Sequence, residues 1–189
     1  MNAPWSTIPQ LVDDAANRFG DREAFVDEDR RWTFTQYRDR IHAAARAFMA
    51  YDVQPGDRIA VWAPNLAEWA VAALGAHCVG AVLVPVNTRF KGREAVDLLA
   101  QSSARILFTV TDFLDTDYVE LLEGQAGLDA LEETVVLHGT ARAETVSFAD
   151  FSARADSVTE DDRAARSAAV DGGDLCHVLF TSGTTGAPK

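Results

Sequence analysis

The chain has 189 residues, of which 48% are hydrophobic and 24% are charged, and its formal net charge at pH 7 is −12. This length is enough to bury the core of one domain or a little more. An acidic protein is repelled by phosphate backbones and anionic lipids, which argues against nucleic acid or a membrane surface as a main partner. A bound nucleotide remains compatible with this charge, because one local pocket can be positive on an acidic protein.

The cysteine content and the N-terminal sequence indicate a cytoplasmic protein. Cys78 and Cys176 both lie in apolar stretches, and no spacing suggests a zinc site or a disulfide framework. The first twenty residues lack the basic stretch and apolar core of a signal peptide. No run reaches the roughly 18 to 20 apolar residues that a membrane-spanning helix needs.

Helix and turn signals define the first third of the chain. A helix is expected to begin after Thr7, a good N-cap, and to end at Gly20. The segments 23–27 and 30–34 flank an acidic turn and predict a β-hairpin. Thr35 is the expected cap of a second helix, which ends at a Pro-Gly turn.

Strands and helices then alternate. The expected strands are 58–64, 81–86, 104–110, 134–138 and 175–180. The expected helices are 66–79 with Asn65 as its cap, 92–102, 115–123 and 148–154. This alternation predicts the α/β fold class, with a parallel or mixed sheet flanked by helices.

Two segments at the C-terminal end differ in character from the rest. Residues 154–174 are acidic, rich in alanine and poor in large apolar side chains, and they predict an exposed connector with one loose helical turn. Residues 175–189 predict a strand followed by a glycine-rich loop.

The sequence LFTSGTTGAPK (179–189) has the chemistry of a phosphate-binding loop. Its glycines carry no Cβ, so backbone N–H groups can converge on an anion, and its hydroxyls and lysine add donors and positive charge. The spacing matches neither a Walker A loop nor a dinucleotide fingerprint. The alternative is a hydroxyl-rich hairpin turn that binds no ligand, but such a turn would need fewer glycines and hydroxyls. The candidate phosphate-binding residues are Thr181, Ser182, Gly183, Thr184, Thr185, Gly186 and Lys189.

Three stretches resemble the adenylate-forming (AMP-binding) superfamily, which includes acyl-CoA synthetases, luciferases and the adenylation domains of peptide synthetases. FTSGTTGAPK resembles its phosphate-loop signature. WTFTQYRDRI (32–41) resembles an earlier conserved stretch, although Arg38 and Asp39 depart from the usual pattern. GAHCVGAVLVPVNTRF (75–90) is similar to a second stretch, and its Asn-Thr-Arg ending favours the acyl-CoA synthetase branch. The resemblance therefore covers essentially the whole chain.

The resemblance implies an ATP-dependent acyl-CoA ligase that uses ATP, Mg²⁺ and CoA. A carboxylate would attack the α-phosphate of ATP, and CoA would then displace AMP. Residues 181–189 would bind the β- and γ-phosphates, with no catalytic residue and no metal ligand in this chain. Segments 63–90 and 179–186 are most similar to actinobacterial ligases for fatty acids or a steroid-derived propanoate.

The same resemblance implies that residues 1–189 are the N-terminal portion of the AMP-binding domain. The sheet would be incomplete, the C-terminal domain with its lysine would be absent, and the fragment alone would be inactive. Its expected partners are a small-molecule carboxylate, ATP and CoA, and a homodimer is left open.

Two other functions remain open. One is a stand-alone nucleotide-binding or partner-docking module without turnover, for which an intact mass near 20.5 kDa in the native cells would argue. The other is an adenylating enzyme that loads a carrier-protein thiol, which competition between CoA and carrier protein would reveal.

Overall fold

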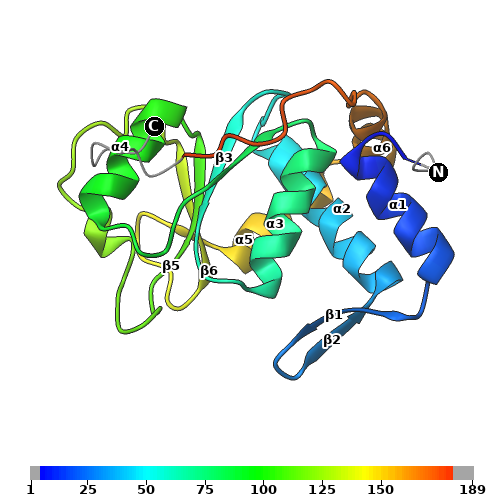
Figure 1. Cartoon of the computed structure of the whole chain (residues 1–189), viewed down its shortest axis with the longest axis horizontal. Coiled ribbons are helices and arrows are strands. Elements are labelled where there is room, and N and C mark those ends of the chain that lie inside the picture. The colour runs from blue at the N-terminus through cyan, green and yellow to red at the C-terminus, as the bar shows by residue number, and fades with distance from the viewer. Residues whose placement is uncertain (1–4, 181–189) are drawn as a thin grey trace.

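The computed structural model describes residues 5–180, whose strands form a five-stranded sheet and a separate two-stranded hairpin (Figure 1). The strands are β1 (Glu23–Asp27), β2 (Arg30–Thr33), β3 (Arg58–Trp62), β4 (Val82–Pro85), β5 (Ile106–Val110), β6 (Glu133–His138) and β7 (Val146–Ser147). The helices are α1 (Ile8–Phe19), α2 (Phe34–Ala50), α3 (Ala67–Cys78), α4 (Gly92–Ser102), α5 (Phe148–Ala153) and α6 (Glu160–Ala168), with short 3₁₀ turns η1 (Glu120–Leu122) and η2 (Arg154–Ser157). The α/β class expected from the sequence is confirmed.

The five-stranded sheet is parallel and has the strand order β4-β3-β5-β6-β7. Helices α2 and α3 lie on one side of it and α4 lies on the other (Figure 1). Strand β5 is buried along its whole length and β3 along all but its first residue, as expected when helices cover both faces of a parallel sheet. On the α2 side, the ring of Phe48 packs edge-on against Phe108 and Phe151, with centroids 5.5 and 5.0 Å away.

The beginnings of two helices differ from the expectation. Helix α2 is capped by Thr33 instead of Thr35, because Thr33 and Gln36 form a reciprocal capping box with bonds of 3.2 and 3.1 Å. Helix α3 has no cap from Asn65. The backbone N–H of Ala67 instead donates to the carboxylate of Asp27, at 3.0 Å. The hairpin therefore supplies the cap of a helix forty residues later, which a local pattern cannot reveal.

The prediction of a loose connector at 154–174 is wrong. The turn η2 and the nine-residue helix α6 occupy most of it, and Thr159 caps α6 by accepting from the N–H of Asp162. Arg163 and Ser167 are 5% and 7% exposed, so one face of α6 packs against the body of the domain. The helix expected at 115–123 is likewise reduced to the single turn η1.

The strand expected at 175–180 is also not formed. A single parallel bridge joins His177 to Leu83 of β4. Leu83 N–H donates to the carbonyl of Cys176 at 2.9 Å, and Val178 N–H donates to the carbonyl of Leu83 at 3.0 Å. The next residue of β4 that would donate in this direction is Pro85, which has no N–H, so the ladder stops.

Among the described helices, none combines the length and the apolar character needed to cross a membrane.

Candidate functional site

The residues predicted to bind phosphate, Thr181, Ser182, Gly183, Thr184, Thr185, Gly186 and Lys189, lie outside the described residues. Their roles therefore stay predictions. The structure describes the segment that leads to them, residues 175–180, and the edge of the sheet that this segment approaches.

Residues 175–180 pass beside β4 in the parallel sense at the bridge between His177 and Leu83. The bridge to Leu83 fixes their direction, so the chain advances toward the carboxyl end of the sheet. Val178 and Phe180 pack against the core, while Leu175 and Leu179 are exposed. Open α/β sheets bind their ligands outside the carboxyl ends of the strands, so the predicted loop follows a segment aimed at the usual edge.

A crevice of about 350 Å³ lies at this carboxyl edge. Strand β4 pairs with one edge of β3 and the next strand, β5, pairs with the opposite edge, so the strand order reverses at β3. Such a reversal commonly opens a binding crevice. The crevice is lined by Asp27, Glu28, Arg30, Pro64, Asn65, Leu66, Val110, Asp112, Phe113 and His138. The ring Nδ1 of His138 lies 3.0 Å from a carboxylate oxygen of Asp112.

The positive charge in this crevice is already paired. Arg30 forms salt bridges with Asp27, at 2.5 Å, and with Glu68. The hydrogen bond that Arg30 donates to Glu68 raises the pKa of Arg30, and burial opposes this rise. Arg30 therefore remains a cation whose donors serve two carboxylates, which makes it a poor partner for a phosphate. Sequence reasoning missed the pair Asp112 and His138, whose only signal was their position at the carboxyl ends of two adjacent strands.

The turn after β4 is held rigidly from two sides. The indole N–H of Trp62 donates to the carbonyl of Asn87 at 3.1 Å, and the hydroxyl of Tyr118 donates to the carbonyl of Thr88 at 2.8 Å. The Trp62 and Tyr118 rings stack with centroids 4.3 Å apart. The Arg89 N–H also donates to the side-chain oxygen of Asn87, at 2.9 Å. The contact of Tyr118 was not predicted, because this residue was expected in a helix at 115–123 and lies instead in the turn before η1.

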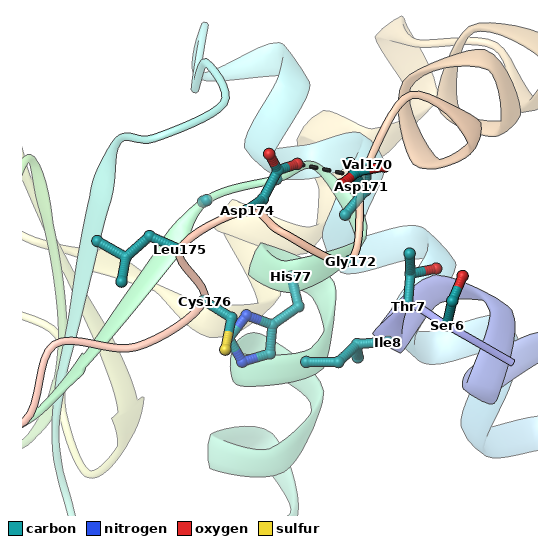
Figure 2. A pocket seen from close by; sticks show the side chains of 12 residues that line it. Ser6, Thr7, Ile8, His77, Val170, Asp171, Gly172, Asp174, Leu175 and Cys176 are labelled. Atoms are coloured by element: carbon teal, nitrogen blue, oxygen red, sulfur yellow. Dashed lines mark hydrogen bonds between the residues drawn. The ribbon is translucent and has the colours of Figure 1, made fainter. Parts of the chain in front are cut away.

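A second cavity, of about 170 Å³, lies beside the segment that leads to the predicted loop (Figure 2). It is lined by the start of α1, the end of α3 and residues 170–176. The ring of His77 points into the region between Ile8 and Cys176 (Figure 2). Burial, and secondarily the charge of His177, lowers the pKa of His77 to about 4, so its ring is neutral at pH 7. Among the described residues, no group of three or more acidic, histidine or cysteine side chains is arranged to hold a metal ion.

Known proteins of one family match nearly the whole chain. The family model described as "AMP-binding enzyme" matches residues 12–189. A 3-[(3aS,4S,7aS)-7a-methyl-1,5-dioxo-octahydro-1H-inden-4-yl]propanoyl:CoA ligase from Rhodococcus jostii is 43% identical over 97% of this chain and 36% of its own length. The ligase of the same name from Mycobacterium tuberculosis is 40% identical over 97% of this chain and 35% of its own length. The chain thus spans about a third of the length of these curated relatives.

Solved structures agree on the fold. A fatty acyl-CoA synthetase from Mycobacterium tuberculosis superposes with a TM-score of 0.78 at 23% identity, over 97% of this chain and 34% of that one. The N-terminal domain of FACL13 from the same organism gives a TM-score of 0.77 at 25% identity, over 97% of this chain and 43% of that one.

Proposed function

This chain belongs to the AMP-binding enzyme family, and on that premise we propose that the protein containing it is an ATP-dependent acyl-CoA ligase. The observation that carries the proposal is the 43% identity to a propanoyl:CoA ligase across 97% of the chain. The parallel sheet, with a segment aimed at its carboxyl edge, supports it as a scaffold for a nucleotide.

The proposed reaction has two steps. A carboxylate oxygen of the substrate bonds to the α-phosphorus of ATP, and the bond from that phosphorus to the oxygen bridging to the β-phosphate breaks, releasing pyrophosphate. The sulfur of CoA then bonds to the acyl carbon, the bond to the AMP oxygen breaks, and the thiol proton is released. The first step is needed because a carboxylate has no acceptable leaving group of its own.

We assign the loop at 181–189 to the β- and γ-phosphates. Converging backbone N–H groups, hydroxyls and Lys189 would offset the negative charge that pyrophosphate gains as it leaves. In the described part of the chain, Arg30 at the carboxyl edge of the sheet is paired with two carboxylates and does not compete for this role. Mg²⁺ would arrive as a complex with ATP, where it neutralises phosphate charge, and no described cluster fits it as a resident metal.

The substrate we propose is a carboxylate derived from steroid degradation, or a fatty acid of similar apolar character. Two relatives, at 43% and 40% identity, are named for the propanoate of a methyl-dioxo-octahydroindene, and this supports the steroid-derived acid as the first choice.

The test uses the native protein, expressed in full from its own gene. It is incubated with ATP, Mg²⁺, CoA and a panel of carboxylates that includes the indane propanoate, octanoate, palmitate and benzoate, and products are followed by mass spectrometry. The proposal expects AMP and an acyl-CoA, with the indane propanoate favoured. Failure of every carboxylate to yield AMP would contradict it. If carrier protein accepts the acyl group in competition with CoA, the carrier-loading alternative takes its place.

A further inference from the structure

Two histidine rings join the end of α3 to the segment that leads to the predicted phosphate loop. The ring centroids of His77 and His177 are 4.7 Å apart, and the ring planes are tilted by 54°. His77 belongs to α3 and is 5% exposed, whereas His177 belongs to residues 175–180 and is exposed. The contact therefore links a fixed part of the core to a segment on the surface.

The backbone alone holds this segment weakly. One bridge, made of two hydrogen bonds to Leu83, joins it to β4. Pro85 ends the ladder on the side of the predicted loop. The position of the segment therefore depends on side-chain contacts as well. Val178 and Phe180 pack against the core beyond the bridge, and the His177 ring makes its contact at the bridge itself.

His77 is suited to be the fixed partner. Its position in the last turn of α3 favours a positive charge, but burial has the larger effect and lowers the pKa of His77 to about 4. The ring therefore stays neutral at pH 7 and does not repel a neighbouring imidazole. Its Nδ1 is buried and makes no hydrogen bond in the described part of the chain, so the ring acts as a packing surface for His177.

We propose that His177, through its contact with His77, is a positioning residue for ATP. This inference rests on the proposed function, because it assumes that residues 181–189 bind the phosphates. A shift of the segment at His177 would be passed to the loop only four residues later. Displacing a binding group by about 1 Å can cost up to ~10²-fold in rate, so a small packing change is enough to be measured.

The first test replaces His177 in the full-length protein and measures steady-state kinetics. His177→Ala is expected to raise the KM for ATP on the order of tenfold while leaving the KM for CoA within about twofold. His177→Phe, which restores a flat ring, should return the KM for ATP toward the wild-type value. Leu175→Ala is the matched control, because Leu175 is exposed in the same segment and lies before the bridge. Equal increases of every KM, or a lowered melting temperature, would indicate a general structural role and overturn the proposal.

The second test needs no turnover. The backbone N–H groups of Val178 and Leu83 form the bridge, so their hydrogen exchange reports how firmly the segment is held. His177→Ala should accelerate both exchange rates, and His177→Phe should restore them. Unchanged exchange in His177→Ala would overturn the proposal. If the wild-type protein shows no ATP-dependent activity, the proposed function fails, and the exchange rates still decide whether the ring contact holds the segment.

Discussion

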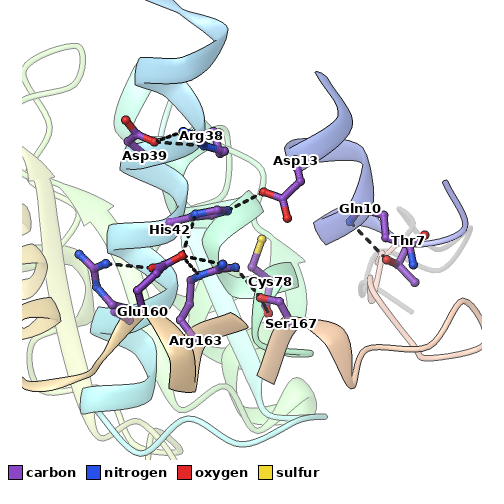
Figure 3. Close-up of polar contacts among 11 residues, drawn as sticks. Thr7, Gln10, Asp13, Arg38, Asp39, His42, Cys78, Glu160, Arg163 and Ser167 are labelled. Atoms are coloured by element: carbon purple, nitrogen blue, oxygen red, sulfur yellow. Dashed lines mark hydrogen bonds and ion pairs between the residues drawn. The ribbon is translucent and has the colours of Figure 1, made fainter. Parts of the chain in front are cut away.

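The hydroxyl of Ser167, on α6, donates a hydrogen bond of 2.7 Å to the backbone carbonyl of Cys78 at the end of α3 (Figure 3). The guanidinium of Arg163 donates to the same hydroxyl at 3.1 Å and also pairs with Glu160. These contacts attach an acidic, alanine-rich helix to a part of the chain 89 residues earlier. Arg46 of α2 adds a salt bridge to Glu160 at 3.0 Å, so α6 is held by both helices.

Removing this attachment should destabilise the domain. Ser167→Ala leaves a buried carbonyl and a buried guanidinium N–H without their partner, and we expect the free energy of unfolding to fall by about 1–3 kcal/mol. Urea denaturation measures this loss. Ser157→Ala is the control, since the Ser157 hydroxyl bonds to the Arg154 carbonyl in an exposed turn. Equal losses in both variants would contradict the role given to Ser167.

A close approach of backbones at the start of α4 should make Gly92 intolerant of a side chain. A Cβ at this position would collide with the backbone carbonyl of Leu121, which cannot rotate away as a side chain could. We expect Gly92→Ala to cost about 1–3 kcal/mol or more of unfolding free energy. Gly173→Ala serves as the comparison, because its Cβ would meet only a side-chain oxygen of Asp171, at 3.2 Å. Wild-type stability of Gly92→Ala would show that η1 does not pack on α4 in this way.

The two cysteines should differ sharply in reactivity. Cys78 is buried, and burial raises the pKa of its thiol to about 12, whereas Cys176 is exposed beside the ring of His177. Because the thiolate is the reactive form, iodoacetamide should label Cys176 and spare Cys78 until the protein unfolds. Peptide mass spectrometry reads each site separately. Comparable labelling of Cys78 in the native state would mean that α3 is more open than described.

The buried imidazole of His77 should make stability depend on pH in a defined window. Its folded pKa of about 4 lies below the value of about 6.5 in an unfolded chain, so the unfolded state binds more protons between these values. Stability is therefore complete above about pH 6.5 and falls as the pH drops toward 4, by up to about 3 kcal/mol from this group. His77→Phe should flatten that part of the curve, as measured by urea denaturation at a series of pH values. An identical pH dependence in the variant would refute the assignment.

Much of the fold could be predicted from local patterns, and two of the failures share a cause. The caps of α1, the buried strands and the alternation of elements depend on residues near one another in sequence. Helix α6 was missed because its stability comes from distant contacts. Its partner in α2 is 114 residues earlier in the sequence, and its partner in α3 is 89 residues earlier. The cap of α3 was missed for the same reason, since Asp27 lies 40 residues before Ala67.

For the candidate site, the sequence predicts only the chemistry of the loop. Glycines, hydroxyls and a lysine within nine residues indicate phosphate binding without any knowledge of the fold. The contacts of the segment before the loop, and of the turn after β4, could not be predicted in the same way. Whether His77 meets His177, and whether Tyr118 reaches the carbonyl of Thr88, depends on how α3, β4 and an irregular segment are packed.

The most direct test of the central claim follows one oxygen atom. The full-length protein is given the preferred carboxylate labelled with ¹⁸O in its carboxyl group, together with ATP and CoA, and the nucleotide products are examined by mass spectrometry. Attack of the carboxylate on the α-phosphate predicts AMP carrying one ¹⁸O atom and unlabelled pyrophosphate. Label in inorganic phosphate, with ADP as the nucleotide product, would mean that the acid is activated as an acyl phosphate, and the acyl-adenylate account would be wrong.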